Sequence, residues 1–337
     1  MRHLVSAVRR PLTQGLLGLT LLATLGLSSA GASATASSTP AGATECDHST
    51  RSSARAMRGT SGGEDYNSVT AAEARSMDAA LQRQIDRLID AGKLTKQGDR
   101  KSQATITIRT YVHIITQKNG KGGVTDQQVA QQMDVINDGY AGTTADEAAP
   151  SPFRFEVADI DRTASNAWYD WNLTPDLSDE DAEAKEAKRA LHEGGYADLN
   201  VYIAGLGSGL LGYATFPGGE LALDGLVLLN ESLPGGDAAP YNLGDTGTHE
   251  IGHWLGLFHT FEGQRCRGAG DEVEDTPLQR TPSSTCKGTE DSCPTAPGTD
   301  PVFNFMDYSP DSCMNQFTPG QVLRMDTNWL AFRDRTT

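Results

Sequence analysis

The most informative segment of the chain is His249-Glu250-Ile251-Gly252-His253-Trp254-Leu255-Gly256-Leu257-Phe258-His259. On a helix, His249 and His253 lie four residues apart, so both imidazoles project from one face toward a single metal ion. His259 comes ten residues after His249, which is about 15 Å along an unbroken helix and too far for one zinc ion. The helix must therefore end between the ligands, and Gly256 can adopt the left-handed turn that ends it.

This spacing predicts a catalytic zinc site. Three histidine ligands leave a fourth coordination position open for water, and Glu250 can reach that water and take its proton. A single histidine in an apolar helix is more often a hydrogen-bonded core residue. However, the probability that a chain of this length carries five such fixed positions by coincidence is on the order of one in 10⁵. A noncatalytic zinc protein would also have no need of Glu250.

The extended motif resembles that of the metzincin metallopeptidases, which combine it with a downstream methionine turn. The candidate turn here is Asn304-Phe305-Met306-Asp307-Tyr308. Further features narrow the resemblance to the pappalysin family: His259-Thr260-Phe261, Asp275-Thr276-Pro277, Cys313-Met314 and Phe317-Thr318-Pro319-Gly320-Gln321. The similarity is dense from about 244 to 325, limited to a general pattern from 105 to 241, and absent before that.

The resemblance implies an α+β catalytic domain of the metzincin, zincin type. Such a domain has a mixed twisted sheet with two long helices in its upper subdomain, a loop-rich, disulfide-tied lower subdomain, and the active-site cleft between them. It implies a zinc endopeptidase that hydrolyses peptide bonds in protein or peptide substrates. Met306 would form a hydrophobic floor under the ligands. Tyr308 could donate a hydrogen bond to the oxyanion of the intermediate, the alternative being a buried turn tyrosine.

The amino-terminal residues 1–34 are predicted to form a signal peptide. Three arginines precede an apolar stretch at 16–27, and small residues around Ala32 and Ala34 follow it. This stretch is too short to span a bilayer, and no later run of about 20 apolar residues occurs, which argues against a membrane-spanning protein. We therefore expect a secreted, extracellular protein.

Residues 35–102 are predicted to form a propeptide, partly helical or disordered, that precedes a catalytic domain at 103–337. The first part is rich in Ala, Ser, Thr and Gly and cannot bury a core. A helix at 70–91 carries an apolar stripe that could dock on the catalytic domain: Ala74, Met77, Leu81, Ile85, Leu88 and Ile89. The basic stretch 93–101 is the expected cleavage site. A passive linker is the alternative interpretation.

Four of the five cysteines lie after the zinc motif. In an exported protein such a cluster indicates two disulfides, with three alternative connectivities. The pappalysin resemblance implies the pairs Cys266–Cys293 and Cys286–Cys313. The fifth, Cys46, lies in the predicted propeptide, where its thiolate could bind the zinc in place of water and keep the precursor latent. An incidental thiol or an intermolecular disulfide are the alternatives.

The acidic segment Asp271-Glu272-Val273-Glu274-Asp275-Thr276 points to a second metal. Clustered carboxylates and backbone carbonyls in a loop suit calcium, which takes six to eight oxygen ligands. The spacing is not that of an EF-hand. The resemblance implies Asp271, the Val273 carbonyl and Thr276 as ligands of a structural Ca²⁺ ion, and a solvated acidic loop is the alternative.

The chain is strongly acidic, with a net charge of −16, and the acidic excess lies in its carboxyl-terminal part. Residues 1–102 carry 13 Lys+Arg and 9 Asp+Glu, whereas residues 103–337 carry 15 and 35. This balance disfavours nucleic acid and anionic membranes as partners, and the sequence carries no signal for an oligomeric state. It fits a solubility adaptation, weak calcium binding or a preference for basic substrates. Asp311 could favour Lys or Arg after the scissile bond.

Periodicity predicts the elements of the catalytic domain. We expect strands at 105–116, 153–160, 199–204 and 226–230, the last as the edge strand above the cleft. We expect helices at 125–140, at 178–192 with a capping box from Ser178, at 243–257 with Asn242 as cap, and at 318–332. Strands and helices followed by about sixty residues of weak periodicity favour the α+β layout.

Three other functions are alternatives to the endopeptidase. A zincin with a downstream glutamate as third ligand is disfavoured because His259 follows Gly256 at the metzincin distance. A noncatalytic secreted binding module would not need Glu250. A zinc amidohydrolase acting on small amides shares the same chemistry and differs only in the shape of its cleft.

Overall fold

The computed structural model describes residues 52–56, 69–92, 104–172, 180–207 and 209–334 of the chain. The predicted signal peptide, Cys46 and the basic stretch 93–101 lie outside these residues. The elements in chain order are β1 (Ser52–Ala56), α1 (Ala71–Asp90), β2 (Ile106–Thr116), α2 (Asp126–Ala141), β3 (Phe153–Ala164), α3 (Asn166–Tyr169), β4 (Asp170–Trp171), α4 (Ala182–Leu191), β5 (Leu199–Leu206), β6 (Leu210–Thr215), β7 (Leu226–Leu229), α5 (Asp245–Trp254), α6 (Pro319–Asn328) and a π-helical turn (Trp329–Arg333).

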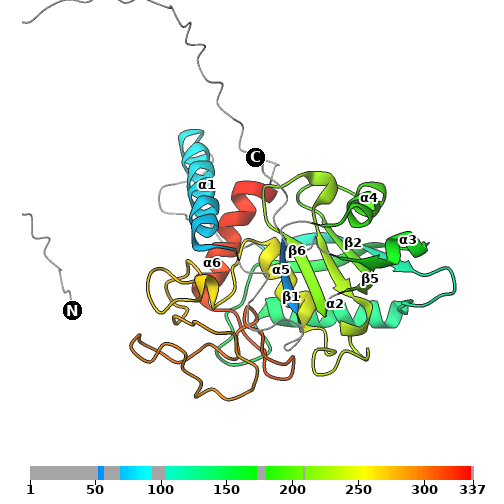
Figure 1. Cartoon of the computed structure of the whole chain (residues 1–337). Coiled ribbons are helices and arrows are strands. Elements are labelled where there is room, and N and C mark those ends of the chain that lie inside the picture. The colour runs from blue at the N-terminus through cyan, green and yellow to red at the C-terminus, as the bar shows by residue number, and fades with distance from the viewer. Residues whose placement is uncertain (1–51, 57–68, 93–103, 173–179, 208, 335–337) are drawn as a thin grey trace, which may run out of the picture. The chain divides into compact units, whose positions relative to one another are not determined.

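The strands form a mixed sheet in the order β1-β6-β7-β5-β2-β3 (Figure 1). Strands β2, β3, β5 and β7 run parallel to one another, whereas β6 is antiparallel to β7, and β1 is antiparallel to β6. Strand β5 is buried along almost its whole length, as expected for a parallel strand covered on both faces. The mixed sheet with helices confirms the predicted α+β fold.

One strand prediction is wrong. The segment at 226–230 was expected at the edge of the sheet, but β7 lies between β5 and β6. Strand β6, which was not predicted, continues the sheet beyond it. All residues of β6 are buried, so its sequence Leu-Leu-Gly-Tyr-Ala-Thr lacks the alternation that marks a half-buried strand. The outermost strand, β1, belongs to the predicted propeptide.

Helices cover both faces of the sheet. On one face, α2, α5 and α6 enclose the main core, to which the buried side chains of Met133, Ile136, Ile251, Trp254 and Met325 contribute. On the other face, α4 packs Ala184 and Ala187 against Tyr202 and Tyr213 of the strands. Among the described residues, no helix is both long and apolar enough to cross a membrane.

The predicted starts of α4 and α5 are wrong. Helix α4 begins at Ala182, and its N-cap is Asp181, whose side chain accepts a hydrogen bond from Ala184 N at 2.8 Å. The expected capping box at Ser178 lies outside the described residues. Helix α2, in contrast, begins after Thr125 as expected, with Gln128 completing a capping box.

Helix α5 begins after Gly244, not after Asn242 as predicted. The side chain of Asn242 donates instead to the carbonyl of Gly236 at 2.6 Å. The backbone N–H groups of Leu243 and Gly244 donate to Oδ2 of Asp311 at 2.9 and 3.2 Å. The start of α5 is therefore held by a carboxylate that lies far away in the sequence, which a local pattern does not reveal.

The segment between α5 and α6 contains little regular structure and carries both disulfides. Cys266 pairs with Cys293, and Cys286 pairs with Cys313, as the family resemblance implied. This segment is the loop-rich lower part of the predicted fold. Helix α6 closes it and begins at Thr318 with a capping box completed by Gln321.

The predicted helix in residues 70–91 is also present. Helix α1 begins after Thr70, whose side chain forms a capping box with Glu73. Its predicted apolar stripe faces the rest of the protein, with Ala74 and Leu81 buried. The helix lies beside α6 (Figure 1).

Candidate metal centre

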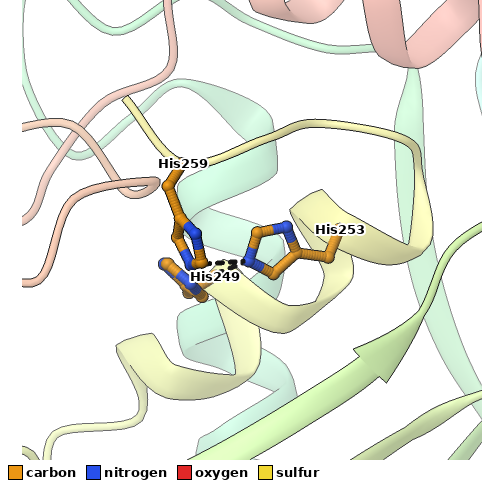
Figure 2. A group of neighbouring side chains, drawn as sticks. All are labelled: His249, His253 and His259. Carbon is orange, nitrogen blue, oxygen red and sulfur yellow. Dashed lines mark hydrogen bonds between the residues drawn. The ribbon is translucent and has the colours of Figure 1, made fainter. Parts of the chain in front are cut away.

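Three histidine side chains meet at the end of α5 (Figure 2). Nε2 of His253 lies 3.0 Å from Nε2 of His249 and 3.2 Å from Nε2 of His259, and all three rings are fully buried. Two nitrogen ligands of one tetrahedral zinc ion are separated by roughly 3.4 Å when each bond is about 2.0–2.1 Å. The spacing of the three nitrogens therefore fits a single zinc ion.

Hydrogen bonds orient two of the rings for metal binding. Nδ1 of His249 lies 2.6 Å from the carbonyl of Phe305, and Nδ1 of His253 lies 2.8 Å from the carbonyl of Leu257. A carbonyl only accepts, so each Nδ1 carries the proton and each Nε2 presents its lone pair. Burial lowers the pKa of His253 well below its usual value, which keeps this ring neutral. Neutral imidazoles with converging lone pairs are the form that binds zinc.

The turn after α5 returns the chain toward the first two histidines. Gly256 has a φ of 92°, and its N–H donates to the carbonyl of His253 at 2.8 Å, while Leu257 N donates to Gly252 O at 2.9 Å. This pair of bonds is the Schellman motif that ends helices at a left-handed residue. A Cβ atom at Gly256 would also lie under 3.0 Å from the side chain of Asn328. Only glycine fits this position.

The third histidine has a different set of neighbours. Its ring stacks on Phe261 with centroids 4.8 Å apart, and Nδ1 of His259 lies 3.9 Å from a carboxylate oxygen of the buried Glu262. At this distance the carboxylate is an electrostatic neighbour of the ring and not a hydrogen-bond acceptor. Sequence reasoning did not single out Glu262, although its position three residues after a ligand was a usable signal.

The methionine turn lies directly under α5. Met306 is fully buried, and a Cβ atom at Gly252, between the two helical histidines, would lie under 3.0 Å from its sulfur. The half-buried ring of Tyr308 lies 4.9 Å from that of His259 and 5.8 Å from that of His249, measured between centroids. The structure thus brings Met306 and Tyr308 to the predicted ligands.

Glu250 is fully buried and lies beneath strand β6. A Cβ atom at Gly212 in β6 would lie 3.0 Å from Cγ of Glu250 and 2.9 Å from the carbonyl of Val227. The glycine therefore allows the strand to pass close over the glutamate. The importance of Gly212 was not predicted, because nothing in the sequence shows which strand covers the helix.

A second buried carboxylate supports the methionine turn from below. Asp307 accepts hydrogen bonds from Gln279 Nε2 and from the backbone N–H groups of Ser283 and Tyr308, at 2.8 to 2.9 Å. Burial raises the pKa of Asp307, and these donors oppose that shift. Gln279 also accepts from Thr260 Oγ1 at 2.6 Å, so the network joins the turn to the segment after His259.

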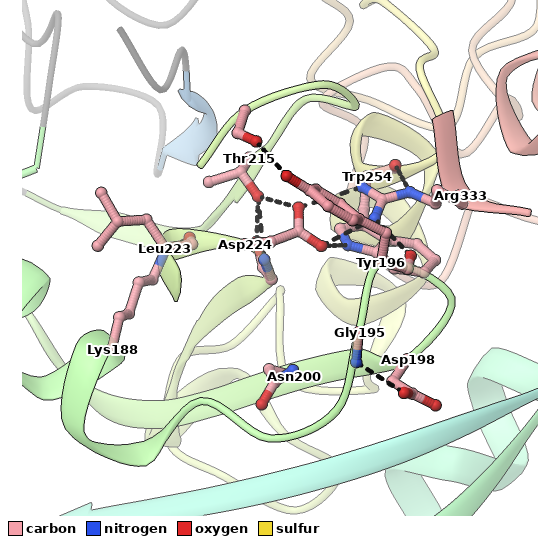
Figure 3. A network of polar contacts seen from close by, with 12 residues as sticks. Lys188, Gly195, Tyr196, Asp198, Asn200, Thr215, Leu223, Asp224, Trp254 and Arg333 are labelled. Atoms are coloured by element: carbon pink, nitrogen blue, oxygen red, sulfur yellow. Dashed lines mark hydrogen bonds and ion pairs between the residues drawn. The ribbon is translucent and has the colours of Figure 1, made fainter. Parts of the chain in front are cut away.

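A buried ion pair supports the far end of α5 (Figure 3). The guanidinium group of Arg333 binds Asp224 at 2.8 Å, donates to the carbonyl of Trp254 at 2.9 Å, and lies 3.4 Å from the centre of the indole. The indole N–H of Trp254 donates to Asp224 at 3.0 Å, as does Thr215 Oγ1 at 2.9 Å. This network joins the carboxyl-terminal turn to the zinc-motif helix and to the end of β6. Sequence reasoning missed it.

The predicted calcium ligands lie together in the loop before α6. Asp271 and Val273 are buried, and Oδ1 of Asp271 accepts a hydrogen bond from Val273 N at 3.2 Å. Oδ2 of Asp271 and Oγ1 of Thr276 are buried, and the side chain of Thr276 contacts the carboxyl group of Asp271. Burial raises the pKa of Asp271 to about 8. Buried oxygen atoms next to a carboxyl group that resists ionisation suit a hard cation such as Ca²⁺, which takes oxygen ligands.

Asp275, in the same acidic segment, contacts the start of α6. Its carboxylate accepts hydrogen bonds from Thr318 Oγ1 at 2.7 Å and from Gly320 N at 2.8 Å, at the start of α6. Asp311 is likewise buried and holds the start of α5, as described above. Its predicted contact with a basic substrate side chain stays a prediction.

Comparisons with known proteins agree with the geometry. The profile of peptidase family M43, described as pregnancy-associated plasma protein-A, matches residues 185–330. Extracellular metalloprotease 1 of Coccidioides posadasii is 44% identical over 239 residues, which cover 68% of this chain and 79% of that protein. An extracellular metalloprotease of Verticillium alfalfae is 40% identical over 272 residues, or 78% and 87% of the two chains.

Two solved structures are also similar. Mature mirolysin of Tannerella forsythia, in complex with a cleaved peptide, is 29% identical and has a TM-score of 0.56, covering 66% of this chain and 90% of mirolysin. A promirolysin mutant from the same organism is 26% identical with a TM-score of 0.59, covering 78% and 93%. The chain belongs to the pappalysin family of metallopeptidases, peptidase family M43.

Proposed function

We propose that this protein is a secreted zinc endopeptidase that is made as a latent precursor. The observation that carries the proposal is the convergence of three histidine Nε2 atoms beside Glu250, under the strand β6. The extracellular names of the relatives support secretion, with residues 1–34 as the signal peptide. In this proposal, residues 35–102 are the propeptide and residues 103–337 the catalytic domain.

Each site residue has a chemical task in this proposal. A zinc ion held by His249, His253 and His259 supplies Lewis acidity that makes hydroxide available near neutral pH. Glu250 takes the proton of the attacking water and passes it to the leaving amine. Tyr308, next to the histidines, donates a hydrogen bond to the oxyanion.

The replacement of Glu250 by glutamine tests this proposal. Glu250→Gln keeps the size of the side chain but removes its ability to accept the proton, so we expect peptide cleavage to fall by about 10²–10⁴-fold. Zinc content should be unchanged, because Glu250 is not one of the ligands. The assay digests a peptide library with parent and variant and sequences the cut ends. Full activity in the variant would contradict the role of Glu250.

The same digestion separates the candidate substrates. Cuts within long peptides support an endopeptidase, whereas turnover of small amides alone supports the amidohydrolase. An excess of Lys or Arg after the cut bond, lost in Asp311→Asn, would support the specificity role of Asp311. Asparagine keeps an oxygen for the N–H groups of Leu243 and Gly244 while removing the charge.

The amino-terminal strand supports latency. Strand β1 pairs antiparallel with β6 from Ser52, opposite Thr215, to Ala56, opposite Leu210. An extended peptide that adds to a sheet edge gains main-chain hydrogen bonds, and proteins often bind peptides in this way. While β1 is paired with it, the edge of β6 next to Glu250 is occupied. A peptide substrate would have to displace the strand.

Cys46 is proposed as a second element of latency, through its thiolate on the zinc. Cys46→Ala should then make the unprocessed precursor active, or speed up its processing. Activity of the full-length chain, measured directly after purification and compared with the parent, checks this expectation. A Cys46→Ala precursor that is as inactive as the parent would remove the thiolate from the proposal.

We also propose a structural calcium ion held by Asp271, the carbonyl of Val273 and Thr276. The support is the buried oxygen atoms of Asp271 and Thr276, together with the raised pKa of Asp271. A bound cation would stabilise the ionised carboxylate and satisfy both oxygens.

A further inference from the structure

We propose that α1 is a docking helix that holds the propeptide on the catalytic domain, on a surface formed by Phe216, Phe258 and Arg324. We call these three residues the docking surface. Arg324 also contacts the turn between two of the zinc ligands, so the docked helix stabilises the latent precursor at its metal site. The inference rests on the proposed function, in which residues 35–102 are a propeptide.

The first part of the contact is apolar. Ala74 is 2% exposed and, with Val69 and Met77, packs in one cluster with Phe216 and Phe258. Both phenylalanines are almost fully buried in the precursor. If α1 left, they would lose their cover, so the release of the helix exposes apolar surface to water and is opposed by the hydrophobic effect.

The second part is an ion pair. Nη1 of Arg324, on α6, lies 2.7 Å from Oδ1 of Asp78 on α1. The arginine side chain is only 10% exposed, and its guanidinium group lies 4.7 Å from the ring centre of Phe258. The pair is therefore shielded from solvent on the arginine side, and it adds orientation to the apolar contact.

The docking surface is connected to the metal site at two points. Nε of Arg324 donates to the carbonyl of Gly256 at 2.9 Å, and Gly256 forms the turn between His253 and His259. The ring of Phe216, directly after β6, lies 5.5 Å from that of His253. The helix α1 thus touches the residues that support two of the three proposed ligands.

The docked helix also explains how a short strand can stay paired to the edge of β6. Strand β1 has five residues, and so short a segment gains little affinity by itself. Residues 57–68 tether it to α1, so once α1 is docked the strand binds its edge in an intramolecular step at high effective concentration. Helix and strand together hold the propeptide more firmly than either one would alone.

The first experiment measures docking by hydrogen exchange in the full-length chain carrying Glu250→Gln, which prevents self-cleavage. Ala74→Glu places a charge in the apolar contact without lowering helix propensity much. Ala79→Glu is the matched control, because it makes the same change on the exposed face of α1. Most of the stability of a helix in a protein comes from packing of its apolar face, so we expect at least about tenfold faster exchange of α1 amides in Ala74→Glu alone.

The ion pair is tested in the same background. Asp78→Asn should speed up α1 exchange by about fivefold, because it removes a partly buried charge pair. Asp86→Asn is the control, since Asp86 accepts a hydrogen bond from Gln82 within the same helix. Unchanged α1 exchange in both Ala74→Glu and Asp78→Asn would overturn the docking of α1. This result does not depend on whether the protein cleaves peptides.

The second experiment uses the chain with Glu250 intact. The time course of propeptide loss and of peptidase activity is compared between Ala74→Glu, Ala79→Glu and the parent. We expect the activity of Ala74→Glu to appear at least about threefold earlier, because an undocked helix no longer holds β1 on its edge. Faster α1 exchange together with an unchanged activation time would overturn the link to latency. Inactivity of all three chains after propeptide loss would refute the proposed function and leave the docking result standing.

Discussion

Asp271 is a buried carboxyl group whose charge depends on what the loop binds. Its pKa is raised by burial from the model-compound value of 3.8 to about 8, so without a cation the folded protein keeps a proton there at neutral pH. The unfolded chain releases this proton above about pH 4. Between these two values the folded state binds more protons, so the free energy of unfolding falls as pH rises.

We therefore predict opposite behaviour with and without calcium. In the Glu250→Gln background with a calcium-selective chelator, the melting temperature should fall between pH 5 and pH 8, because Asp271 must ionise while buried. Saturating calcium should remove this slope and raise the melting temperature at pH 8. Asp271→Asn should show a shallower slope, to which the raised pKa of Asp307 still contributes, and no calcium effect. If parent and variant had the same pH dependence, Asp271 would not be the titrating group.

At the scale of single residues, the sequence predicted the ligands but not their support. The spacing of His249, His253 and His259 predicts a common metal ion, because a helix that ends at Gly256 can bring the three rings together. The sequence also singled out Glu250 and Tyr308. Glu262 and Gly212 act through neighbours that are known only once the chain is folded.

At the scale of secondary structure, the end of α5 decides whether the third histidine can reach the other two. Gly256 has a φ of 92°, where a residue with a Cβ atom costs roughly 1–2 kcal/mol. The added clash with Asn328 raises this cost.

We predict that Gly256→Ala lowers both the melting temperature and the affinity for zinc, since relief of the clash moves His259. Gly195→Ala is the control, because a Cβ atom at Gly195 meets nothing within 4 Å. Thermal melts and zinc competition with a chromophoric chelator provide the readouts. Equal effects of the two substitutions on zinc affinity would count against the turn as the reason for the geometry.

The elements that the sequence predicted well are those with local signals. Helices α1, α2 and α6 begin at threonine caps with a partner three residues later, and each start was expected. Strand β6 has no alternation because it is buried on both faces. The start of α5 depends on Asp311, whose role appears only when the methionine turn packs below the helix.

At the scale of the whole molecule, the Arg333–Asp224 pair connects the carboxyl-terminal turn to the metal-site helix and the sheet (Figure 3). Both side chains are almost fully buried, so removal of one leaves an unpaired charge in the interior. Removal of one partner lowers the free energy of unfolding by roughly 3–5 kcal/mol, whereas removal of both partners leaves no unpaired charge.

We predict a strongly non-additive double-mutant cycle. Arg333→Met and Asp224→Asn should each lower the free energy of unfolding by several kcal/mol. The loss in the double variant should be smaller than the sum of the two single losses, by roughly 0.5–3 kcal/mol. Urea unfolding in the Glu250→Gln background gives the four values. Additive losses would mean that the two groups do not act as a pair.

The metallopeptidase family could be predicted from the sequence alone, because the histidine spacing, the adjacent glutamate and the glycine turn are all local along the chain. The sequence also determined the α+β class, through the periodicities of the strands and helices. Only the tertiary structure decided which strand lies over Glu250, which carboxylates hold the helix ends, and where α1 docks. These contacts join residues far apart in sequence, such as Asp78 with Arg324, and their energies depend on burial that no local pattern specifies.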